Sequence, residues 1–206
     1  ERHLPRVLIR SHDERRATAS ESLLRRTVLD VPIPARRAWI DLEPGVLVAS
    51  PGQVWPAERG DPRRLPAFAP GLQASAPTWL PPAPDIQGHP VVTVVLAIPG
   101  ADGTATGVAA VEIDAGWMTE QLLVPEVWRS QADVRGRLLD AEGRVVLSTT
   151  DEPTGVVVDD PALTAAIAER RSGQTLSGGR RILHHRLASN GWWSIVDAPL
   201  DTPLGE

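Results

Sequence analysis

Glu112 is the residue of this chain best suited to chemistry, because it interrupts an otherwise apolar segment, VAAVEID. A carboxylate buried among apolar side chains needs a partner or a raised pKa, so Glu112 is a candidate to receive an ammonium group or to pair with Arg63. Alternation along a strand gives a second interpretation, which we favour: if Val111 and Ile113 face the core, Glu112 points outward. Asp85, in the loop after a cluster of prolines, is a weaker candidate of the same kind.

Two adjacent arginines, Arg63 and Arg64, lie in a segment, residues 51–90, that holds ten of the twenty prolines. The planar guanidinium group binds a carboxylate through two parallel hydrogen bonds, so a small organic anion is a ligand that this pair would suit. The alternative is that both are solvated loop residues, as charged side chains in loops usually are.

The same segment and its surroundings contain three of the few aromatic residues of the chain, Trp55, Phe68 and Trp79. Ligand pockets are mostly apolar with a few directed polar groups, so these rings are candidates to wall a pocket. They are equally suited to pin an irregular loop onto the domain. The sequence leaves both interpretations open.

Signatures of enzymes and metal centres are missing from the sequence. It contains no GxSxG, GxxxxGK[ST], GxGxxG or HExxH pattern and no cysteine. His184 and His185 are adjacent, so on a strand they face opposite sides and cannot bind one ion together. Asp159 and Asp160 suggest an acid pair, but Asp160 before Pro161 is better explained as a helix cap. We expect no catalytic residue, metal or cofactor in this domain.

Composition describes a folded domain for which nucleic acid is not the partner. The formal charge is −5, and the 21 basic residues, all arginine, are scattered and outnumbered by 26 acidic ones. No apolar run approaches the roughly 18 residues that span a bilayer. The chain begins at Glu1 and its only methionine is Met118, so we expect the natural protein to extend upstream. A domain cut from between two membrane helices would have these features.

Hydrophobic patterns predict an N-terminal helix followed by two similar parts. Residues 3–30 predict a helix with an arginine-rich face. The apolar runs of residues 90–114, with a turn at Asp102-Gly103, predict a hairpin covered on both faces. A weaker copy of this hairpin spans residues 135–149.

The other predicted elements complete an α+β (mixed α/β) fold with antiparallel sheets. In chain order they are a strand pair at 38–42 and 46–49, a long irregular loop at 51–90, a short helix at 116–124, a helix that starts at Asp160-Pro161, and a final hairpin of 180–186 and 192–197.

Several of these segments, in this order, resemble the double Cache family, the extracytoplasmic sensor domains of bacterial transmembrane receptors. The matching segments are DPRRLP at 61–66, Trp79, GHPVVT at 88–93, GVAAVEI at 107–113, LLDAEGRVV at 138–146 and GWWSIV at 191–196. The resemblance implies a long N-terminal helix at 1–34, a membrane-distal Cache module at 35–124 and a membrane-proximal PAS-like module at 125–206. Each module is expected to be an antiparallel sheet flanked by helices.

The resemblance also implies a function. The chain is expected to bind a small molecule in the distal module, without catalysis, as the periplasmic part of an inner-membrane receptor. That receptor would be a sensor histidine kinase, a chemoreceptor or a cyclic-di-GMP enzyme, and its N-terminal helix would form a homodimer. The expected ligand-binding residues are Arg63, Arg64, Phe68, Trp79, Asp85 and Glu112.

The chain departs from the members of the family that bind amino acids. Those members carry an Arg-Pro-Trp-Tyr run, a later tyrosine and an aspartate that closes the last distal strand. The aligned run here is Leu-Pro-Ala-Phe at 65–68, the tyrosine position is Ala83, and the aspartate position is Glu112. Two further functions stay open: an interaction module that engages a periplasmic partner protein, and a hydrolase that uses Glu112 with Asp85 or an arginine.

Overall fold

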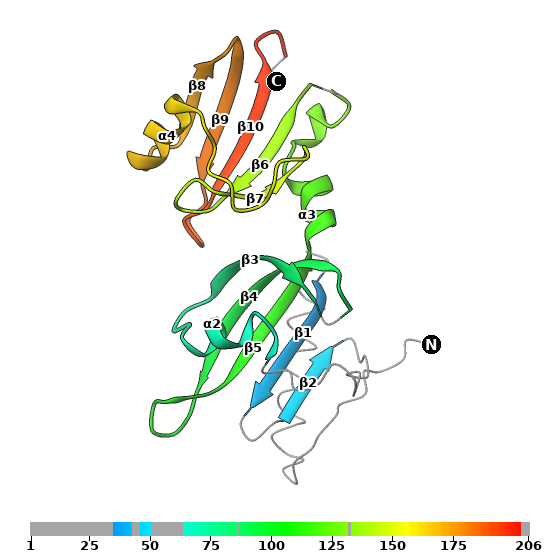
Figure 1. Ribbon diagram of the computed structural model, residues 1–206, viewed down its shortest axis with the longest axis vertical. Helices are drawn as coiled ribbons and strands as arrows, with labels where there is room; N and C mark the ends of the chain where they lie inside the picture. Colours follow the sequence, from blue (N-terminus) through cyan, green and yellow to red (C-terminus); the bar gives the residue numbers. More distant parts are fainter. Residues whose placement is uncertain (1–34, 43–45, 51–63, 86, 132, 203–206) are drawn as a thin grey trace. The chain divides into compact units, whose positions relative to one another are not determined.

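The computed structural model describes residues 35–42, 46–50, 64–85, 87–131 and 133–202. The chain divides into two compact units, Glu1–Asp114 and Ala115–Glu206, and each contains one antiparallel sheet (Figure 1). This confirms the predicted α+β class with two antiparallel sheets. The helix predicted at 3–30 lies outside the described residues. Contacts divide the chain after Asp114, whereas the expected module boundary follows residue 124.

The first sheet has the strand order β2-β1-β5-β4-β3, and every neighbouring pair is antiparallel. Its strands are Ala35–Leu42 (β1), Val46–Ser50 (β2), Thr78–Pro84 (β3), Pro90–Pro99 (β4) and Ala105–Asp114 (β5). The predicted strand pair and hairpin are both confirmed. The hairpin turns where expected: Gly103 has a φ of 82°, and the Gly100 N–H donates to the Thr104 carbonyl at 2.7 Å.

The proline-rich segment is more regular than expected. The prediction of one irregular loop over 51–90 is wrong for the part that the structure describes, because it contains α2 (Phe68–Leu72) and β3. β3 lies at the edge of the sheet, and its outer side has no neighbouring strand. A proline, which lacks an N–H, therefore costs no hydrogen bond on that side. Its register with β4 shifts around Pro81 and Pro82.

One face of the first sheet is covered by α2, and we call it the first inner face (Figure 1). Its core includes Val95 of β4, Val108 of β5, Trp39 of β1 and Phe68 of α2, all buried. Gly71 brings α2 close to the sheet, because a Cβ atom there would lie 2.5 Å from Val108 Cγ1. The helix therefore packs directly on the central strand.

The second sheet repeats this arrangement, with the strand order β7-β6-β10-β9-β8. Its strands are Arg135–Leu139 (β6), Val145–Ser148 (β7), Gly173–Ser177 (β8), Arg180–Arg186 (β9) and Trp193–Pro199 (β10). The unit also contains the helices α3 (Ala115–Leu122), η3 (Glu126–Trp128) and α4 (Pro161–Ala168). No helix among the residues that the structure describes is both long enough and apolar enough to cross a membrane.

The second unit confirms most predicted elements. The Asp160 carboxylate accepts the Leu163 N–H at 2.9 Å and caps α4, as the Asp-Pro pair predicted. The final hairpin is also confirmed, as β9 and β10. The edge strand β8 was not predicted; it turns into β9 through Gly178 and Gly179, whose φ angles are 55° and 75°.

The two faces of the second sheet are covered by different elements. The second inner face packs Leu139, Ile195 and Trp193 against Leu163 of α4. The opposite face packs β10 residues against Val124 and Trp128, along with other residues of the chain that leads into β6. Both faces are therefore closed by elements of the same unit.

Candidate functional site

Glu112 lies on the first inner face, not on the outside. It shares this face with Ala110 and Val108, two and four residues before it on β5, and is 2% exposed. The interpretation that we favoured, an outward glutamate, is therefore wrong. Alternation could not decide the matter because both faces of the central strand are covered: Ile113, on the other face, is 4% exposed.

The Glu112 carboxylate accepts a hydrogen bond from a tryptophan that the sequence analysis did not single out. Trp39 Nε1 donates to Glu112 Oε1 at 2.8 Å, and the Trp39 side chain is fully buried. A charge-assisted hydrogen bond of this kind stabilises an ionised carboxylate. Thr93, directly opposite Glu112 on β4, is 4% exposed and adds a hydroxyl to the same row. The first inner face therefore carries a buried polar row across β5 and β4.

Of the expected aromatic residues, the structure brings Phe68 to the Glu112 face. Phe68 is buried in the core beneath α2, together with Trp39. Trp79 is half-buried and lies on the opposite face, since its neighbour Leu80 packs against the inner core and alternate residues of a strand face opposite sides. Trp55 lies outside the described residues.

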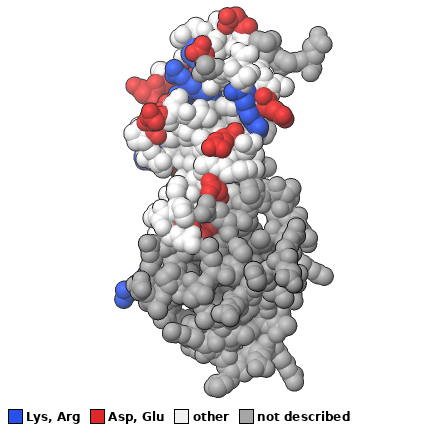
Figure 2. Space-filling model, turned by 90° about the vertical axis from the view of Figure 1, so that its right-hand side faces the viewer, with Lys and Arg blue, Asp and Glu red and all other residues white. Residues whose placement is uncertain are grey.

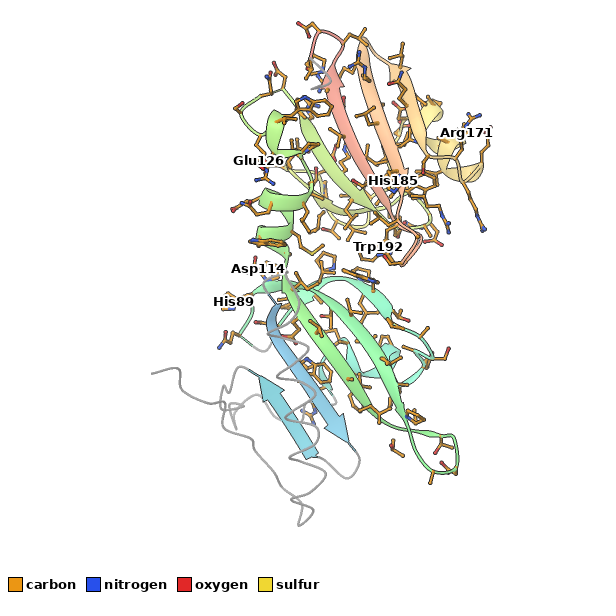
Figure 3. All side chains as sticks on the ribbon, turned by 180° about the vertical axis from the view of Figure 1, so that it is seen from behind. His89, Asp114, Glu126, Arg171, His185 and Trp192 are labelled. Atoms are coloured by element: carbon orange, nitrogen blue, oxygen red, sulfur yellow. The ribbon has the colours of Figure 1, made fainter. Side chains whose placement is uncertain are left out.

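Asp85 is buried, at 5% exposed, but it organises a turn. Its Oδ1 accepts the N–H groups of Gln87 at 2.7 Å and His89 at 2.9 Å. Asp140 accepts the N–H groups two and four residues later in the same way, at 3.0 and 2.8 Å, in the turn between β6 and β7. The turn of Asp85 joins β3 to β4 near the end of β5, where Figure 3 labels His89 and Asp114.

The arginine pair is only partly described. Arg64 is exposed just before α2, and Arg63 lies outside the described residues, as does the pairing of Arg63 with Glu112. Among the described residues, no group of three or more His, Cys, Asp or Glu side chains is placed to hold a metal ion. His184 is buried and His185 exposed, which confirms that they face opposite sides.

The second inner face holds a charged cluster that the sequence analysis missed. Arg137 donates from Nε and Nη2 to the two carboxylate oxygens of Glu152, both at 2.6 Å. Arg180 Nε donates to Asp197 Oδ1 at 2.5 Å, and Asp197 Oδ2 lies 3.9 Å from Arg137 Nη1. Basic and acidic side chains are intermingled over this unit (Figure 2). The one signal in the sequence was an acid within an apolar strand, WSIVDAP, as with Glu112.

The hydrogen bonds of this cluster shift the pKa values of its members. The hydrogen bond from Arg137 lowers the pKa of Glu152, and the same bond raises the pKa of Arg137, against the opposing effect of burial. Both residues are therefore held in their charged forms.

Solved structures match this chain in fold, although no protein-family model and no curated protein sequence matches it. The ligand-binding domain of the Pseudomonas aeruginosa PAO1 amino acid chemoreceptor PctB, in complex with L-Arg, is 17% identical, with a TM-score of 0.65 over 94% of this chain and 76% of that one. The ligand-binding domain of the Pseudomonas fluorescens chemoreceptor CtaA, with L-leucine, is 16% identical, with a TM-score of 0.61 over 92% and 80%.

The extracellular domain of the putative histidine kinase rpHK1S-Z16 is 20% identical, with a TM-score of 0.58 over 88% of this chain and 77% of that one. The order of elements and the repeated sheet thus agree with what the resemblance to the double Cache family implied. The chain has the fold of the extracellular ligand-binding domains of bacterial chemoreceptors and histidine kinases.

Proposed function

We propose that this chain is the extracytoplasmic sensing domain of a transmembrane receptor, and that a small solute binds on the first inner face. The observation that carries the proposal is the fold, which nearly the whole chain shares with ligand-binding domains solved with amino acids. Membrane helices that flank the domain anchor the receptor, and the domain lies in the periplasm. The receptor dimerises through the N-terminal helix. Its output is a kinase, a chemotaxis apparatus or a cyclic-di-GMP enzyme.

The polar row of the first inner face supports a ligand with an ammonium group. Glu112 is a buried carboxylate, oriented by Trp39 and flanked by Thr93, in a water-poor setting where a charge pair is strong. We favour such a ligand over the organic anion suggested by Arg63 and Arg64, because Arg64 is exposed. Phe68 and its neighbours supply the apolar part of the site.

The substituted amino-acid motif bears on which amines fit. The aligned Leu-Pro-Ala-Phe run contains no side chain that would pair with a ligand carboxylate. We therefore expect amines without an α-carboxylate to bind at least as well as α-amino acids. The ligand binds one packing of the domain more tightly than another, and binding therefore shifts the receptor toward the first packing. The domain catalyses no reaction.

A thermal-shift and calorimetric screen of the 206-residue chain tests this proposal, with amines, α-amino acids and small carboxylates as separate panels. We expect an amine to raise the unfolding temperature, because a ligand that binds only the folded state stabilises it. Glu112→Gln should weaken binding about 10- to 100-fold, since a charge-assisted hydrogen bond contributes about 1.5–3 kcal/mol.

Glu120→Gln is the matched control, because Glu120 is an exposed acid on α3. This variant removes the same charge from an exposed position of the second unit and should bind like the natural sequence. No response to any panel, or full affinity in Glu112→Gln, would contradict the proposal. A carboxylate response that Arg64→Gln abolishes would instead support the anion.

A further inference from the structure

We propose that Arg137 forms a carboxylate-binding position on the second inner face, which Glu152 fills from within the chain. Arg137 is held on β6, opposite Ile195 of the central strand β10. Its side chain is 11% exposed, so its guanidinium is largely removed from water. A buried guanidinium requires an anion, and a carboxylate with two parallel hydrogen bonds is the anion that fits its geometry.

The cation and the anion of this pair are held very differently. Arg137 belongs to a strand with neighbours on both sides, β7 and β10. Glu152 belongs to the connection between β7 and α4, outside any helix or strand, and its side chain is 34% exposed. The guanidinium is therefore fixed within the sheet, while the carboxylate that pairs with it comes from a loop.

Hydroxyl groups complete the position that the carboxylate occupies. Ser148 Oγ donates to Glu152 Oε2 at 3.1 Å and is also 2.8 Å from Thr150 Oγ1. The site therefore offers three hydrogen bonds to one carboxylate, two from Arg137 and one from Ser148. These donors do not depend on the rest of the glutamate side chain, so a small free carboxylate satisfies them equally well.

The charge of the cluster favours one external anion when Glu152 leaves. With Glu152 in place, the charges that act on one another here are balanced. The guanidinium groups are those of Arg135, Arg137 and Arg180, and the carboxylates are those of Glu152, Asp160 and Asp197. Without Glu152 the cluster has a surplus of one positive charge. The ligand class is therefore a small monocarboxylate, the size of formate or acetate.

Removal of the internal carboxylate tests the proposal in the full chain. We expect Glu152→Ala to lower the unfolding temperature, and sodium acetate to restore about 4 °C or more relative to sodium chloride at equal ionic strength. The natural sequence should respond equally to the two salts, because Glu152 competes for the site. Calorimetry of Glu152→Ala with acetate should give saturable binding.

The double variant Arg137→Gln/Glu152→Ala is the control, and it should lose the difference between acetate and chloride. An equal acetate effect in all three proteins, or none in Glu152→Ala, would overturn the proposal. Where Glu152→Ala does not fold, Glu152→Gln provides the same comparison with a neutral side chain of similar size. Adding Glu112→Gln to Glu152→Ala should leave the acetate response of Glu152→Ala unchanged, so this result is independent of ligand binding in the first unit.

Discussion

Glu112 and Asp197 are buried acids at corresponding places in the two sheets. Each lies two residues before the end of a central strand, β5 or β10, on the face that a helix covers. The donor to Glu112 is the neutral indole of Trp39, whereas the donor to Asp197 is the charged guanidinium of Arg180. The charge of Asp197 is therefore balanced by a hydrogen-bonded arginine of its own unit.

His184 makes the stability of the second unit depend on pH. It is 3% exposed and lies 6.3 Å from the Trp193 ring. Burial lowers the pKa of His184. A hydrogen bond with the Arg171 backbone opposes this effect, and the charge of Arg171 adds to it. The folded state therefore keeps the ring neutral where the unfolded state binds a proton.

The sign of this effect follows from proton linkage. As pH falls below the ordinary histidine value of 6.5, the unfolded chain takes up a proton that the folded chain does not, so stability decreases until the lowered pKa is reached. We expect a slope of up to about 1.4 kcal/mol per pH unit in the free energy of unfolding. His184→Leu should remove this slope and His185→Gln, at an exposed position, should keep it. Identical slopes in both variants would refute the assignment.

Single residues show what the sequence could and could not reveal about the site. The sequence identified Glu112 as exceptional, but its face depended on which side α2 covers, and that is set by contacts distant along the chain. Trp39 was missed because its role depends on β1 pairing with β5 across more than seventy residues. The turn role of Asp85 was overlooked although its Asp-x-x-Gly spacing, repeated at Asp140, marks a turn; its role as a ligand group stays a prediction.

At the scale of elements, the strands were predictable wherever a turn signal separated two apolar runs. β4 and β5 are such a pair, as are β9 and β10. β3 was missed because its prolines argue against pairing, and only its place at an edge makes them tolerable. β8 was missed because GQTLS is short and largely polar, as expected of an edge strand with little of its surface buried.

Gly136 determines how the chain enters the second sheet. A Cβ atom at this position would lie 2.3 Å from the Leu123 carbonyl oxygen and 2.6 Å from its carbon. Backbone cannot yield as a flexible side chain does, so we expect Gly136→Ala to cost about 1–3 kcal/mol of stability through overpacking. Denaturant unfolding of the full chain, monitored by tryptophan fluorescence, measures this loss.

Gly173 provides the matched control on the edge strand β8. A Cβ atom there would meet only His184 Cε1, at 3.8 Å, an ordinary contact distance, and its φ is not positive. Gly173→Ala should therefore leave the denaturation midpoint nearly unchanged. If Gly173→Ala lowered the stability as much as Gly136→Ala, the conformational freedom of glycine, and not the close approach of Leu123, would explain both losses.

At the scale of the whole chain, one five-stranded arrangement is used twice. Both sheets have the order 2-1-5-4-3 when their strands are numbered within the unit, so each central strand is the last of its unit. Each sheet is completed by its own strands, with a helix from the same unit on the inner face. The sequence predicted this duplication from two similar hairpins, because each hairpin carries its turn signal locally.

The limits of the second unit can be tested by comparing two fragments. Ala115–Glu206 contains both clusters that cover the second sheet and exceeds the roughly 60 residues at which domains begin to fold alone. We expect it to unfold cooperatively in denaturant, with Trp193 in a fixed environment.

A fragment of residues 125–206, which starts at the boundary expected from the sequence, lacks Leu123 and Val124, and both are buried. It should be less stable by about 2–5 kcal/mol, because their apolar surface no longer covers the sheet. Equal stability of the two fragments would instead place the boundary after residue 124.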